Sequence, residues 1–163
     1  MISYPCVIRR EARFVTAEFP DCPGCQTFVE RGGEIAPMAA EALQGWLEAW
    51  LAEGEAPPRP TPRQRPPRGG RVIAVPVPPR LGLTLALRWA RQDAGLSQAA
   101  LARQLGVSQQ AIAKVEHPDA NPTLDTLLRV AAALGMSLSL SRQPVGSSRR
   151  RDVLLPHPGP LPR

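Results

Sequence analysis

The chain has 163 residues, enough for one domain or two small ones, and its formal charge of +6 is unevenly distributed. Residues 1–56 carry 4 Arg against 9 Asp and Glu, residues 57–80 carry 6 Arg and no acid, and residues 81–163 carry 10 Arg and Lys against 5 acids. The acidic front suits a basic protein partner, and the basic rear suits a polyanion.

The composition also bears on the cellular compartment. No apolar run approaches the ~20 residues of a membrane helix, and the N-terminus lacks the pattern of a signal peptide. The three cysteines are an odd number, which fits a reducing compartment better than a disulfide framework. We therefore expect a cytoplasmic protein that makes no membrane contact.

Three strand-like segments open the chain at residues 3–9, 13–18 and 26–29, where β-branched and aromatic residues alternate with turn-forming stretches. A helix is expected from about residue 36 to Gly54. Apolar residues at three- and four-residue intervals give it one apolar face: Met38, Ala42, Leu43, Trp46, Leu47, Trp50 and Leu51. The sequence predicts a β-β-β-α module over residues 1–54.

Residues 55–80 are rich in proline and arginine and are interpreted as an extended linker. Within them, residues 71–77 (RVIAVPV) could form one more strand, which Pro76 would confine to the edge of the sheet. The linker arginines either contact DNA phosphates or form a solvated spacer, and the sequence favours neither.

Residues 81–142 have the pattern of an all-α domain. A first helix is expected over about 84–94, followed by two short helices within residues 96–116. Ser97 and Ser108 stand where helix N-caps are needed, and Gly106 stands at the intervening C-cap. We expect an inward apolar stripe formed by Leu101, Leu105, Val107, Ile112 and Val115.

A longer helix is predicted from Thr123, as N-cap, to about residue 134. Its inward residues are expected to be Leu124, Leu127, Leu128, Ala131 and Leu134. Residues 137–141 (SLSLS) alternate like a strand, and pairing of two such strands across a two-fold axis would give a homodimer or higher oligomer. Residues 143–163 are expected to be a disordered basic tail. The fold class is therefore α+β.

Residues 83–136 resemble the Cro/repressor (XRE) type of helix-turn-helix domain. The resemblance rests on Ser97-Gln98, LGVSQQ at 105–110, Glu116 and the run NPTLDTLLRVAAALG at 121–135. In such a domain the second helix enters the major groove. We expect base contacts from Ser108, Gln109, Gln110 and Lys114, because these polar side chains suit base edges. The resemblance implies phosphate contacts from Ser97 and Gln98, at the positive end of the preceding helix.

Residues 3–53 resemble the HicB antitoxin domain, most specifically in the loop EFPDCPGC at 18–25. The resemblance implies a truncated ribonuclease H fold without the nuclease site. It also implies that the chain blocks HicA, a small basic mRNA-cleaving toxin, and represses the shared operon. The sequence departs from the pattern at Cys22, at Arg31-Gly32-Gly33 and in its long linker.

No arrangement of residues predicts catalysis, a cofactor or a metal. Cys22 and Cys25 have redox or zinc-like spacing, but the pair lies in a turn between strands and is interpreted as loop structure. Two alternatives to an antitoxin remain. One is a stand-alone dimeric regulator whose front module senses a ligand or only dimerises, and the other is a thiol- or metal-based sensor.

Overall fold

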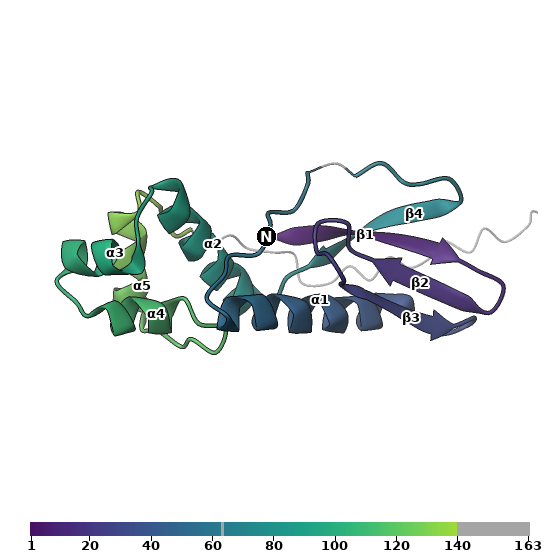
Figure 1. Ribbon diagram of the computed structural model, residues 1–163, viewed down its shortest axis with the longest axis horizontal. Coiled ribbons are helices and arrows are strands. Elements are labelled where there is room, and N and C mark those ends of the chain that lie inside the picture. Colours follow the sequence, from purple (N-terminus) through teal and green to yellow (C-terminus); the bar gives the residue numbers. More distant parts are fainter. Residues whose placement is uncertain (63, 140–163) are drawn as a thin grey trace, which may run out of the picture.

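The computed structural model describes residues 1–62 and 64–139, which fold into a sheet with one covering helix and a bundle of further helices (Figure 1). This arrangement confirms the α+β class. The elements are β1 (Ser3–Arg10), β2 (Phe14–Glu18), β3 (Gln26–Glu30), α1 (Ile35–Ala52), β4 (Gly70–Pro76), α2 (Pro79–Asp93), α3 (Gln98–Leu105), α4 (Gln109–Val115) and α5 (Leu124–Ala133).

The sheet has the order β3-β2-β1-β4, and every neighbouring pair is antiparallel. Three of the strands follow the expected β-β-β segments. β4 confirms the fourth, edge-strand interpretation: it lies beside β1, with Pro76 opposite Ser3. An edge position tolerates Pro76 because proline has no N–H to donate to a further strand.

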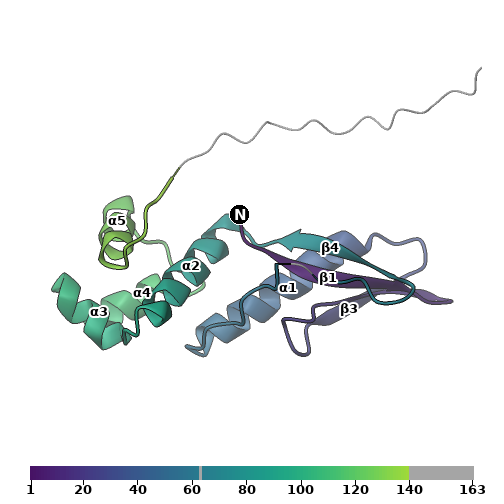
Figure 2. The same cartoon turned by 90° about the horizontal axis from the view of Figure 1, so that it is seen from above.

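Helix α1 covers one face of this sheet (Figures 1 and 2). Its fully buried residues recur every four positions and pack on β-strand residues such as Tyr4 and Ile8: Ile35, Ala39, Leu43, Leu47 and Leu51. The expected apolar face was therefore partly wrong, because Met38 lies beside this stripe and is 40 % exposed. Trp46 and Trp50 are half-buried and pack against each other with ring centroids 5.0 Å apart.

Helix α2 begins at Pro79, five residues before the expected start at Thr84. Proline is suited to the first helical turn because its missing N–H has no helical partner there. The extra turn carries Leu81 into the core of the sheet and α1, where Leu85 follows it. Two residues after Leu85, Leu87 belongs to the core of the C-terminal helices. A single helix therefore contributes to both hydrophobic cores.

The segment 55–62 is attached to both halves of the protein rather than spanning freely between them. Pro57 is buried, and its carbonyl accepts a 2.9 Å hydrogen bond from Nε1 of Trp89. The next carbonyl, of Pro58, accepts a 2.7 Å bond from the Tyr4 hydroxyl. Arg59 lies over the Trp89 ring and pairs with Asp93 at 2.6 Å. Among the residues that the structure describes, this part of the predicted linker is a strap that contacts β1 and α2.

Two expectations about the C-terminal helices were wrong in detail. Leu124 and Leu128 are 66 % and 49 % exposed and Val107 is 36 % exposed, although all three were expected to point inward. Helix α5 instead packs through a narrower stripe that includes Val130 and Ala131, since only one side of this peripheral helix faces the core. Residues 137–139 form no strand, and residues 140–141 and the predicted tail 143–163 lie outside the described residues.

Candidate nucleic-acid interface

The helices α3 and α4 are joined by a tight turn whose geometry follows from three residues. Ser97 Oγ accepts a 3.1 Å hydrogen bond from the Ala100 amide, and Ser108 Oγ accepts one of 3.2 Å from the Ala111 amide. Both serines thus serve as the predicted N-caps. Gly106 has φ +66°, the left-handed conformation in which glycine ends a helix without steric cost.

The N-terminal part of α4 presents polar side chains to solvent. Ser108, Gln109, Gln110 and Lys114 are all exposed. In the described part of the chain, no hydrogen bond holds the amides of the two glutamines or the Lys114 ammonium. These groups are free to meet a ligand, while Ile112 and Val115 on the opposite side of α4 are buried. The structure therefore brings the four residues together on one short helix, as the sequence predicted, and their contacts with bases stay a prediction.

The two predicted phosphate contacts differ in their surroundings. Ser97 is exposed at the start of α3. Gln98 is half-buried, and its Nε2 donates a 3.1 Å hydrogen bond to Oε2 of Glu116. This bond ties the first turn of α3 to the end of α4, so Gln98 supports the packing of the two helices. A phosphate contact from the second N–H of this side-chain amide or from the backbone N–H stays a prediction.

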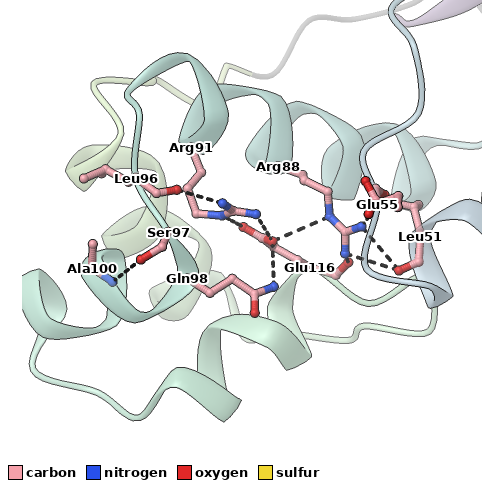
Figure 3. A network of polar contacts seen from close by, with 9 residues as sticks. All are labelled: Leu51, Glu55, Arg88, Arg91, Leu96, Ser97, Gln98, Ala100 and Glu116. Atoms are coloured by element: carbon pink, nitrogen blue, oxygen red, sulfur yellow. Dashed lines mark hydrogen bonds and ion pairs between the residues drawn. The ribbon is translucent and has the colours of Figure 1, made fainter.

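Glu116, which follows α4, is the centre of a buried ionic cluster (Figure 3). Its side chain is 2 % exposed, and its two oxygens accept bonds of 2.6 and 2.8 Å from Nε and Nη2 of Arg91. Arg91 also donates a 2.8 Å bond to the carbonyl of Leu96, in the turn before α3. The cluster therefore holds α2, α3 and α4 in one geometry.

Arg88, one turn before Arg91, extends the cluster to the N-terminal half (Figure 3). Its Nη2 donates a 2.7 Å bond to the carbonyl of Glu116, and its Nη1 donates a 2.6 Å bond to the carbonyl of Glu55. Both nitrogens also lie 3.3 Å from the carbonyl of Leu51 at the end of α1. Burial lowers the pKa of Arg88, and the nearby Glu116 carboxylate opposes that effect.

Sequence reasoning found Glu116 as part of a motif but missed both arginines. An arginine within an amphipathic helix is usually exposed, so neither residue stood out in the pattern. The available signal was the spacing of Arg88 and Arg91, which places both on one face of α2 together with the apolar Leu81 and Leu85.

Comparisons with known proteins agree with this geometry. A helix-turn-helix family model matches residues 87–140. An uncharacterized HTH-type transcriptional regulator of Haemophilus influenzae is 43 % identical over 61 residues, 37 % of this chain and 62 % of that protein. The antitoxin HicB 1 of Photorhabdus laumondii is 29 % identical over 123 residues, 76 % of this chain and 75 % of that protein. The chain carries a helix-turn-helix domain and resembles HicB antitoxins along most of its length.

A solved chain from a HicA3 and HicB3 toxin-antitoxin complex is also similar, at 28 % identity and a TM-score of 0.37, covering 48 % of this chain and all of that chain. The chain spans about three fifths of the length of the Haemophilus regulator. The two curated relatives are described as a regulator and an antitoxin rather than as enzymes. Within residues 1–62 and 64–139, no helix is long and apolar enough to cross a membrane.

The cysteines of this HicB-like module are buried free thiols. Burial raises the pKa of Cys6 and of Cys25 to about 11, and burial together with Cys25 and Asp21 raises that of Cys22 to about 12. In the described part of the chain, no group of three His, Cys, Asp or Glu residues is placed to hold a metal ion. Asp21 instead accepts bonds of 2.8 and 2.7 Å from the amide and hydroxyl of Thr61.

These raised pKa values predict low thiol reactivity. Because the thiolate is the reactive form, the native chain at pH 8 should react with a disulfide reagent at least ~100-fold more slowly than the urea-unfolded chain. The rate is measured from the released chromophore under both conditions. If any one cysteine of the native chain reacted within tenfold of its rate in the unfolded chain, the result would contradict this prediction and favour the thiol-sensor alternative.

The exposed amide of Gln109 supports a second prediction. Replacing Gln109 by alanine should weaken binding to a preferred duplex by roughly 1–3 kcal/mol and relax base preference at one position. Binding to unrelated DNA should change little, because backbone contacts are retained. The measurement is selection of duplexes from a randomised pool by the wild type and by Q109A. An identical selected sequence would contradict the assignment of Gln109 to a base.

Proposed function

We propose that the chain is an antitoxin that binds a HicA-like toxin through its N-terminal module and represses its own operon through its helix-turn-helix domain. The observation that carries this proposal is the similarity to the HicB 1 antitoxin, which extends over 123 residues and thus beyond the helix-turn-helix domain alone. Both halves of the chain therefore contribute to the resemblance.

The geometry of the C-terminal half supports the DNA-binding part of this proposal. A capped α4 presents Gln109, Gln110 and Lys114 on an exposed surface, and Ser97 lies at the start of α3, where backbone amides favour a phosphate. We infer that α4 enters the major groove and that a homodimer places two copies about 34 Å apart on a symmetric operator. The exposed Leu124 and Leu128 of α5 are available to such a dimer contact. Repression of an operon places this activity in the cytoplasm.

The acidic composition of the N-terminal module supports the toxin-binding part. Glu41 and Glu48 lie along α1 and Glu53 is its C-cap residue, while the buried stripe of the helix is turned toward the sheet. Negative charge on this helix would favour encounter with a basic toxin. The proposed toxin is a ribonuclease, and the antitoxin acts by covering its surface rather than by any chemistry of its own.

Co-expression with the product of the neighbouring small open reading frame tests the antitoxin function. We expect a complex that is stable in size-exclusion chromatography and restored growth of cells that express the small protein. The double variant Q109A/Q110A is a matched control, because it alters only the DNA-facing residues and should protect as well as the wild type. No complex and no protection would refute the toxin-binding half of the proposal.

The second candidate function is a stand-alone transcriptional regulator, which the Haemophilus relative favours. That relative matches over 61 residues, a span that fits the helix-turn-helix half alone. This function predicts that the chain binds its promoter equally well with and without any small partner. An antitoxin that represses conditionally should instead bind DNA with an affinity that its toxin changes.

A further inference from the structure

The structure contains a direct polar connection between the N-terminal module and the end of the DNA-recognition helix. Arg88 is 2 % exposed and bonds to three carbonyls from two separate parts of the chain. Two of them, of Leu51 and Glu55, belong to the end of α1 and the residues that follow it. The third belongs to Glu116, the C-cap of α4. No other side chain among the described residues bonds to both places.

The chemistry of the α1 end explains why an arginine is needed there. The C-terminal carbonyls of a helix lack helical partners and carry partial negative charge. The last turn of α1 has no basic residue of its own. The Gly54 amide donates a 3.2 Å bond to the Leu51 carbonyl, and Arg88 of α2 supplies the positive charge and further donors. The planar guanidinium fixes the directions of these donors, which a lysine ammonium would leave free to rotate.

The end of α4 depends on the same guanidinium. The Glu116 carboxylate is already held by Arg91, and its backbone carbonyl is held by Arg88 at 2.7 Å. The Arg88 Nε lies 3.5 Å from the Glu116 carboxylate, within ion-pair distance but without a hydrogen bond. A displacement of the α1 end would therefore either leave buried donors of Arg88 unpaired or pull on the residue that ends α4. The second result changes the position of the end of α4, and the first destabilises the arrangement of Arg88 that holds this end.

We propose that Arg88 is a positioning residue for α4 and that, through its contacts with the end of α1, it makes DNA recognition depend on the state of the N-terminal module. This inference deepens the proposed function and rests on its DNA-binding half. A partner that binds the module and shifts α1 would act on the end of α4 directly through this side chain, in addition to any movement of α2, which both cores share. The coupling runs both ways, because linkage requires that DNA affects partner affinity by the same factor.

A substitution at Gly54 would disturb the contacts between Arg88 and the end of α1 without changing any side chain of α1 or α4. It has φ +85°, and an added Cβ would meet no atom within 4 Å, so Gly54→Ala strains only the backbone between the Leu51 and Glu55 carbonyls. Gly24 is the matched control. It also lies in the N-terminal module, has φ +79° and has open space around a Cβ, but it makes no contact with Arg88.

The first measurement is amide hydrogen exchange of the full chain without DNA. We expect Gly54→Ala and Arg88→Lys to raise exchange at the amides of Glu116 and His117, which bond to α4 carbonyls, by about tenfold. The α3 amides, such as Leu101, are the internal reference, and their exchange should change little. Gly24→Ala should change neither set. Equal exchange at the end of α4 in Gly54→Ala and Gly24→Ala would overturn the proposal.

The second measurement uses a duplex selected by the wild type from a randomised pool and a scrambled duplex of equal length. Gly54→Ala and Arg88→Lys should lower the ratio of the two affinities about tenfold, which corresponds to the loss of one good base contact. A residue that only stabilised the fold would lower both affinities together. An unchanged ratio would overturn the proposal. If the wild type selects no sequence, the proposed DNA-binding function fails, and the exchange measurement still decides the role of Arg88.

Discussion

Replacing Glu116 by alanine is expected to lower the free energy of unfolding by about 3–5 kcal/mol. The substitution leaves Arg91 and Arg88 buried, at 9 % and 2 % exposure, without the carboxylate that compensates their charge. It also removes the acceptor of Gln98. A typical domain has a total stability of only ~5–15 kcal/mol, so this loss is a large fraction of the free energy that keeps the helix-turn-helix half folded. Urea unfolding monitored by far-UV circular dichroism measures the change.

Glu18 provides the matched control for this experiment. It makes an equally short ion pair with Arg9, at 2.6 Å, but both side chains are about half exposed. Glu18→Ala should therefore cost at most about 1 kcal/mol. Glu116→Gln keeps the shape of the side chain and one acceptor oxygen. We expect it to lower the free energy of unfolding by an amount between those of Glu116→Ala and Glu18→Ala. Similar losses for Glu116→Ala and Glu18→Ala would show that the buried cluster does not stabilise the domain.

Replacing Leu85 by alanine should lower the free energy of unfolding by about 2–5 kcal/mol, as expected for a fully buried leucine. Leu85 lies in α2 but packs in the core of the sheet and α1. Since α2 also provides Leu87 to the other core, loss of this contact should reduce the stability of both halves. Tryptophan fluorescence from Trp46 and Trp50 of α1 and Trp89 of α2, and circular dichroism from all helices, should then report one common transition.

Leu124→Ala is the control for the second experiment, because Leu124 is 66 % exposed on α5 and its truncation should change stability by no more than about 0.5 kcal/mol. If Leu85→Ala unfolded in two separate transitions and the stability of the helix-turn-helix half were unchanged, α2 would not couple the stability of the two cores. A monomeric sample at low concentration is needed, since a dimer contact through α5 would make Leu124→Ala concentration-dependent.

The elements of the fold could be predicted because their signals are local. Ser97 and Ser108 cap the helices that the sequence assigned to them, and Gly106 adopts the left-handed conformation that its position requires. Pro76 lies in an edge strand for a reason that is visible in the residue type, because proline has no backbone N–H to donate to a further strand. The same holds for the exposed glutamines of α4, whose placement depends only on helical periodicity.

What the sequence did not reveal depends on contacts between distant residues. Arg88 bonds to carbonyls 33 and 37 positions before it and 28 positions after it. Because every residue has a backbone carbonyl, the sequence does not indicate which residues accept these bonds. The exposure of Leu124 and Leu128 depends on how α5 sits on the bundle, which an apolar repeat cannot specify. The contacts of the strap were hidden for a similar reason, because proline-rich composition gives no indication of the Tyr4 and Trp89 donors that hold it.

The sharing of α2 between two cores restricts how such proteins exchange parts during evolution. A recombination junction at residue 80 or 81 would separate Leu81 and Leu85 from the sheet that they fill. Without these two leucines the core of the sheet and α1 would contain a cavity, and in the other recombinant the two leucines would be exposed to solvent. A viable junction lies after Leu85 only if the incoming helix carries an arginine and a tryptophan at positions 88 and 89, which bond to the carbonyls of Glu55 and Pro57. Under the proposed function, DNA specificity is therefore expected to diversify by substitution on α4 rather than by replacement of the whole helical half.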